Sequence, residues 1–173
     1  MSKCINCGKD ANVILDNESL CTNCFNEYMS EQMDLNKPKD IPEYLFFEDC
    51  NKVMHSFNIE FMIFPMGLSL RAIEVSPDEY ECSIFGELDE EFPVMWNKLL
   101  VKLQKMLSLK YTVDGNWAKD LAVGRLEYNE DSDYSDVVID GKRVTWEDLG
   151  MFLNRYQGFQ IKIEIADATD DLF

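Results

Sequence analysis

Residues 4–24 read CINCGKDANVILDNESLCTNC and contain two Cys-X-X-Cys pairs separated by thirteen residues. The four cysteines are Cys4, Cys7, Cys21 and Cys24. Two pairs at this spacing are typical of a structural zinc site, because each pair wraps around one side of a tetrahedral ion. Four thiolates leave no open position for water, so we expect one structural Zn²⁺ per chain and no catalytic metal. Two redox-active Cys-X-X-Cys pairs are the alternative interpretation.

The residues around the two pairs predict the local fold of this region. Gly8 follows the first pair and allows the tight turn of a knuckle, since it has no Cβ. Residues 13–20 predict a short hairpin around Asp16-Asn17, and residues 25–33 predict a helix that follows the second pair. This order of knuckle, hairpin and helix resembles treble-clef and zinc-ribbon modules, including the small zinc-binding module at the front of bacterial ClpX-type unfoldases.

A polar segment separates this region from the rest of the chain. Residues 34–42 (DLNKPKDIP) carry Pro38 and Pro42, which disfavour a continuing helix. We therefore predict two parts that fold separately. They are a zinc-binding module over residues 1–36 and an acidic α+β domain over residues 40–173.

Hydrophobic patterning after residue 40 predicts a mainly antiparallel sheet packed with two to three helices. Strands are expected at residues 59–64, 68–75, 80–86, 123–128 and 159–165, with a turn at 76–78 and a hairpin over 137–144 around Asp140-Gly141. Helices are expected at residues 43–57, at 92–109, and from Thr145 to a stop at Gly158.

The helix that begins at Thr145 carries a capping-box pattern. The Thr145 hydroxyl is expected to accept from the amide near Asp148, while the Asp148 side chain reaches back. Its expected buried stripe is Leu149, Phe152, Leu153 and Tyr156.

The net charge of −17, from 33 acidic and 16 basic residues, limits the classes of partner. Such a charge repels phosphate backbones and anionic membrane surfaces, so direct binding to nucleic acid or to a membrane is not expected. The opening MSKCINCGKD has no apolar core of a signal peptide, and no apolar stretch reaches the roughly 20 residues that span a bilayer. Paired cysteines indicate a metal site in a reducing compartment, so we expect a cytoplasmic protein.

No further residues form a specific catalytic pattern. His55, the only histidine, follows Cys50 by five positions, and we interpret the two as an ordinary surface or core pair and not as a nucleophile or metal site. Cys82 is expected to be a small buried residue of a strand. The acidic loop at residues 129–136 lacks the glycine and closing glutamate of an EF-hand and is interpreted as solvated. Phosphate-loop, dinucleotide, serine-hydrolase and zincin motifs are absent.

Most of residues 43–170 resembles an uncharacterised bacterial domain family of unknown function. The resemblance is carried by FGELDEEFP (85–93), VGRLEY (123–128) and VVIDGKRVTWEDLGMFLNRYQGFQIKIEI (137–165). It implies a bacterial cytoplasmic protein, and it brings neither an activity nor catalytic residues.

Three function hypotheses follow. The first is a non-enzymatic zinc-binding protein that acts as a protein-protein interaction or adaptor module. The second is an acidic decoy that occupies a basic, nucleic-acid-binding surface of a partner protein, for which the net charge is the motive. The third is an enzyme with an unrecognised site in the α+β domain.

Overall fold

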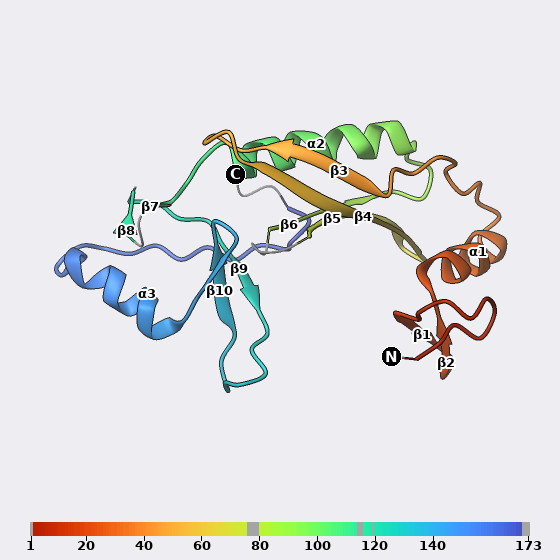
Figure 1. Cartoon of the computed structure of the whole chain (residues 1–173), viewed down its shortest axis with the longest axis horizontal. Helices are drawn as coiled ribbons and strands as arrows, with labels where there is room; N and C mark the ends of the chain where they lie inside the picture. The colour runs from red at the N-terminus through yellow and green to blue at the C-terminus, as the bar shows by residue number, and fades with distance from the viewer. Residues whose placement is uncertain (1, 76–79, 114–115, 119, 171–173) are drawn as a thin grey trace.

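The protein is described by a computed structural model over residues 2–75, 80–113, 116–118 and 120–170. The described residues form α-helices and antiparallel sheets, which confirms the predicted α+β class. Three regions follow one another along the chain (Figure 1). The N-terminal module lies at one end, a central sheet covered by a long helix lies in the middle, and most of the distal region, from residue 111 onward, lies at the other end. The last described residues return to the central part, where the Lys102 ammonium donates to the Ala168 carbonyl at 2.8 Å.

The N-terminal module is built from a short hairpin and one helix. β1 (Val13–Leu15) pairs antiparallel with β2 (Glu18–Leu20), and α1 (Thr22–Gln32) follows. Asp16 and Asn17 have φ angles of 48° and 69°, as a tight two-residue hairpin turn requires. The predicted hairpin and the predicted helix are therefore confirmed.

The central sheet contains four antiparallel strands in the order β3-β4-β5-β6. They are β3 (Tyr44–Glu48), β4 (Met54–Phe64), β5 (Gly67–Glu74) and β6 (Glu81–Gly86). The helix α2 (Phe92–Leu107) packs across β5 and β6 and buries Met95, Leu99 and Leu103 completely. These residues belong to the apolar stripe that predicts the helix, so this prediction is confirmed, as are the three strands predicted between residues 59 and 86. The turn predicted at 76–78 lies outside the described residues.

The helix predicted over residues 43–57 is wrong. β3 and the first part of β4 occupy this segment, joined by a turn in which Asp49 Oδ1 accepts from the backbone N–H groups of Asn51 (2.8 Å) and Val53 (2.9 Å). The spacing of the apolar residues predicts a helix here because β3, an edge strand, carries an apolar residue on its solvent-facing side as well. This residue is Phe46, which is 66 % exposed. Apolar side chains on both faces hide the alternation that marks a strand.

The distal region contains short strands and one helix. A small antiparallel sheet has the order β11-β10-β9, and two shorter strands, β7 and β8, pair with each other. The elements are β7 (Thr112–Val113), β8 (Asn116–Trp117), β9 (Arg125–Glu127), β10 (Asp136–Ile139), β11 (Lys142–Val144), α3 (Trp146–Leu153) and the 3₁₀ turn η1 (Asn154–Tyr156). Asp140 and Gly141 have positive φ angles, which confirms the predicted hairpin turn.

The start of α3 matches the prediction, and its apolar stripe does so in part. Thr145 Oγ1 accepts from the Asp148 N–H at 3.1 Å and donates to the Asp148 carboxylate at 2.8 Å. Of the expected stripe, Leu149 and Phe152 are half-buried and pack against the small distal cluster, Tyr156 is half-buried, and Leu153 is exposed. The predicted face is therefore confirmed in part, although none of its residues is fully buried.

The strand predicted over residues 159–165 is wrong, since these described residues form no strand. A strand needs a hydrogen-bonded neighbour, and none of the described strands pairs with this segment.

The buried side chains form two clusters of unequal size. The larger cluster runs from Leu20, Phe25 and Met29 of the N-terminal module through the central sheet to α2. The smaller cluster lies in the distal region and buries Tyr111, Ile139 and Val144. The N-terminal module therefore packs on the central sheet, and the distal region encloses only a small core.

We expect a fragment of residues 40–173 to fold without the N-terminal module, because α2 and the four strands enclose most of the larger cluster themselves. The melting midpoint of the fragment should be lower than that of the intact chain. Removing the N-terminal module uncovers Phe64, whose ring contacts the ring of Phe25. Thermal denaturation followed by circular dichroism measures both quantities. A fragment without a cooperative transition would show that the chain has one shared core.

Candidate metal centre

Two neighbouring structures supply the four cysteines. Cys4 and Cys7 lie in a turn before β1, where the Cys4 N–H donates to the Lys9 carbonyl and the Gly8 N–H donates to the Cys4 carbonyl, both at 2.8 Å. Gly8 has a φ angle of 73°, the left-handed conformation that glycine adopts at little cost. Cys21 is the N-cap residue of α1, and Cys24 lies in its first turn. The knuckle and the helix start thus face each other.

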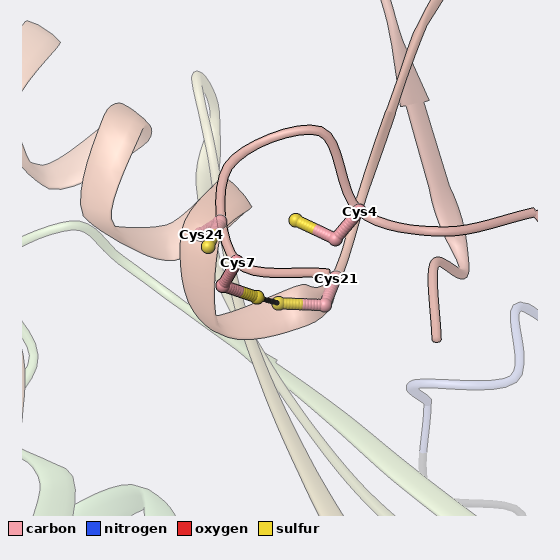
Figure 2. Close-up of side chains that lie close together, drawn as sticks. All are labelled: Cys4, Cys7, Cys21 and Cys24. Atoms are coloured by element: carbon pink, nitrogen blue, oxygen red, sulfur yellow. Dashed lines mark hydrogen bonds between the residues drawn. The ribbon is translucent and has the colours of Figure 1, made fainter. Parts of the chain in front are cut away.

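The four sulfur atoms converge on one point (Figure 2). All lie within 4.8 Å of one another, and the Cys7 and Cys21 sulfurs are 3.5 Å apart. A Zn–S bond of about 2.3 Å in tetrahedral geometry places sulfurs about 3.8 Å apart. The spacing in this protein therefore suits a tetrahedral metal ion with four sulfur ligands. The structure brings together all four cysteines that the sequence singles out.

The surroundings shift the pKa values of Cys4, Cys7 and Cys24 in different directions. The backbone N–H of Cys21 is the main group that lowers the pKa of Cys4, to about 6, against the effect of burial. The thiol of Cys7, followed by burial, raises the pKa of Cys24. The backbone N–H of Lys9 favours the Cys7 thiolate, but the Cys21 thiol and burial outweigh it and raise the pKa of Cys7. A divalent cation would offset the repulsion among four thiolates, so metal binding should release protons.

A buried asparagine attaches this centre to the central sheet. Asn26, on α1 and 2 % exposed, donates through Nδ2 to the Phe61 carbonyl at 2.7 Å. Its Oδ1 accepts from the Ile63 N–H at 2.9 Å. Both backbone groups lie on β4 beyond the last residue paired with β3. The asparagine side chain therefore takes the place of a neighbouring strand along this part of β4.

His55 and Cys50 do not form a reactive pair. Cys50 is exposed in the turn before β4, whereas His55 is buried within β4. His55 Nδ1 lies 2.6 Å from the Glu74 carboxylate, and its Nε2 lies 3.5 Å from the Asp49 carboxylate. Asp49 also faces Lys110 at 3.4 Å. This polar cluster links the β3–β4 turn, β4, β5 and the segment that follows α2. Sequence spacing could not reveal it, because the strand register brings its members together.

Cys82 and the acidic loop are the remaining candidates. Cys82 is buried in β6. In the acidic loop, Asn129 Nδ2 donates to the Asp136 carboxylate at 3.0 Å. Within the described ranges, the four cysteines are the group of His, Cys, Asp or Glu residues found with converging ligand atoms. The carboxylates of the acidic loop do not form such a group there.

Two families of unknown function match parts of this chain. A domain of unknown function, DUF7686, matches residues 39–108, which hold the central sheet and α2. A second domain of unknown function, DUF7713, matches residues 114–170 of the distal region. No curated protein and no solved structure matches the chain. Among the described residues, none of the helices has the length and apolar character that crossing a bilayer requires.

Proposed function

We propose that this chain is a non-enzymatic protein in which one structural zinc ion stabilises a protein-protein interaction module over residues 1–36. The observation that carries the proposal is the convergence of four cysteine sulfurs within 4.8 Å. Four sulfur ligands in tetrahedral geometry favour zinc or iron among the common metals, and they leave no open position for catalysis. We place the module in the treble-clef and zinc-ribbon class and the protein in the bacterial cytoplasm.

Exposed apolar residues on the N-terminal module support an interaction role. Ile5, in the knuckle, is 62 % exposed, and Ile14, on β1, is 77 % exposed. Isoleucine at exposed positions adds nothing to the core of the module, whereas such side chains are suited to a contact with another protein. The side of the module that faces the central sheet is occupied by Asn26 and Phe25, so a partner would contact the opposite side.

The metal identity is tested by elemental analysis of reduced, chelator-free protein, with an expected content of about one zinc per chain. Absence of visible absorption would distinguish zinc from an iron-sulfur centre. The interaction role is tested by quantitative capture of partners with the wild type, Ile14→Asp and Cys50→Ser. A partner retained by Cys50→Ser and lost by Ile14→Asp supports the proposal. Equal capture by all three proteins contradicts the proposed face.

We expect no measurable binding of the intact protein to duplex DNA at physiological salt. Before Asp34 the module carries two basic residues, Lys3 and Lys9, against Asp10, Asp16, Glu18, Glu27 and Glu31. A surface of this charge lacks the cationic footprint that phosphate binding needs. Fluorescence anisotropy with labelled duplex measures the binding, and tight binding would contradict the interaction proposal.

The salt dependence of partner binding separates this proposal from the acidic decoy. The net charge of −17 favours a decoy only if the partner is basic. Affinity for a basic partner should then fall steeply as salt rises, because many exposed charges are screened. A contact through Ile5 and Ile14 should depend only weakly on salt.

A further inference from the structure

The segment after α3 is extended and exposes a row of large apolar side chains. Residues 159–165 read FQIKIEI, and Figure 1 shows the chain after α3 running past β10 as a coil. The exposed fractions are 75 % for Phe159, 67 % for Ile161, 76 % for Ile163 and 81 % for Ile165. Between residues 160 and 166 no backbone hydrogen bond to another described residue is formed. A soluble chain rarely leaves such a sequence without a partner.

The alternation in this segment is that of a β-strand. The Lys162 ammonium and the Glu164 carboxylate are 2.7 Å apart, so these two side chains point to the same side. Ile161, Ile163 and Ile165 alternate with them and therefore belong to the other side. The segment has the two faces of a strand, one apolar and one charged, but it lacks a neighbouring strand.

The rest of the distal region offers little cover for this apolar face. Its cluster buries Tyr111, Ile139 and Val144, while Trp146 and Met151 of α3 are exposed. Among its described residues, the distal region thus exposes more large apolar side chains than it buries. Burying apolar surface is the main favourable term in association, so the missing cover should come from another surface.

We propose that residues 159–165 pair antiparallel with the same segment of a second copy of this chain, in a register centred on Ile163. In this register Ile163 faces its own counterpart, and Ile161 faces Ile165 of the second copy. Lys162 faces Glu164 of the second copy, and the two-fold symmetry forms this opposite-charge pair twice. All apolar pairs then lie on one face of a two-stranded ribbon.

The neighbouring registers are less favourable for physical reasons. A register centred on Lys162 places two lysines directly opposite each other, which is destabilising. A shift by one residue places apolar side chains opposite charged ones on the same face. The pairing of Lys162 with Glu164 therefore favours the same segment of a second copy as the partner strand of residues 159–165. It also favours the register centred on Ile163. An isolated ribbon is marginal in water, so we expect exposed residues of α3 such as Met151 to be buried with it.

Charge exchange tests the pairing in the intact, zinc-loaded chain. Dimerisation is measured by sedimentation equilibrium at physiological salt over a wide range of protein concentration. Lys162→Glu and Glu164→Lys each replace two opposite-charge pairs by two like-charge pairs, so each should raise the dimer dissociation constant roughly tenfold or more. The double variant should restore dimerisation. A mixture of the two single variants should form heterodimers, because each acidic segment then faces a basic one.

Cross-linking tests the register. In a Cys50→Ser background, Ile163→Cys should form a disulfide-linked dimer under mild oxidation, because opposite Cα atoms in a strand pair lie about 4.5 to 5.5 Å apart. Ile161→Cys is the matched control. Ile161 faces Ile165 of the second copy, so the two introduced cysteines are four residues apart along the strands and cannot form a disulfide. Both side chains are exposed, so neither change should unfold the monomer.

Three results would overturn the proposal. They are a monomer at every concentration, a dimer whose dissociation constant does not respond to the charge exchange, and a disulfide that forms faster with Ile161→Cys than with Ile163→Cys.

Discussion

Replacing Cys21 with serine is expected to abolish stoichiometric metal binding and to unfold the N-terminal module. A bound metal ion contributes its binding free energy to folding, so losing one of four thiolates should cost the module several kcal/mol. Serine is a favoured N-cap residue, so Cys21→Ser does not weaken the start of α1. The loss of stability should therefore report on the metal and not on the helix.

Cys50→Ser is the matched control for this change, because Cys50 is an exposed cysteine outside the metal centre. It should keep a full metal content and change the free energy of unfolding by less than about 0.5 kcal/mol. Metal content is measured by elemental analysis, and the state of residues 1–36 by amide hydrogen exchange. A Cys21→Ser protein with full metal content and unchanged exchange would show that the four cysteines do not act as one site.

Asn26→Ala should cause a large loss of stability for a single polar side chain. It leaves the Phe61 carbonyl and the Ile63 N–H without the partners that bond them at 2.7 and 2.9 Å. Each unsatisfied buried polar group costs about 1 to 3 kcal/mol, so a total of about 2 to 6 kcal/mol is expected for the two groups. The change should also loosen the N-terminal module from β4, because these bonds join the two directly.

Asn12→Ala is the control for this substitution. Asn12 donates to the Thr22 hydroxyl at 2.7 Å, but this bond is exposed, so its loss should cost less than about 0.5 kcal/mol. Chemical denaturation measures both variants, and the metal content should stay at the wild-type level in each. Equal stability of the two variants would mean that water replaces Asn26 along β4 and that the module is not held by this side chain.

The metal centre, the hairpin turns and the helix α2 can be predicted from the sequence, because each depends on residues close together in the chain. Two Cys-X-X-Cys pairs predict the convergence that the structure shows. Asp16-Asn17 and Asp140-Gly141 predict hairpin turns because these residue types tolerate positive φ angles, which all four adopt. The stripe of α2 also predicts its buried face, since period and burial coincide in a helix that covers a sheet.

Sequence reasoning fails where a partner far along the chain decides the conformation. Residues 43–57 carry apolar residues on both faces, and pairing of β3 with β4 makes them strands. In residues 159–165 the opposite holds: the alternation of a strand is present, but no described strand supplies the hydrogen bonds. Periodicity reports which face a segment can bury, and it does not report whether a neighbour exists.

By itself, the sequence therefore determines the four cysteines of the metal centre, the turns and the amphipathic helix, because spacing, positive φ and helical period act within a few residues. Only the tertiary structure decides that Asn26 occupies the open edge of β4 and that His55 lies between Glu74 and Asp49. The Asn26 bonds join residues 35 and 37 positions apart. A polar side chain at such a distance finds its partner through the packing of strands and helices, and this packing leaves no periodic mark in the sequence.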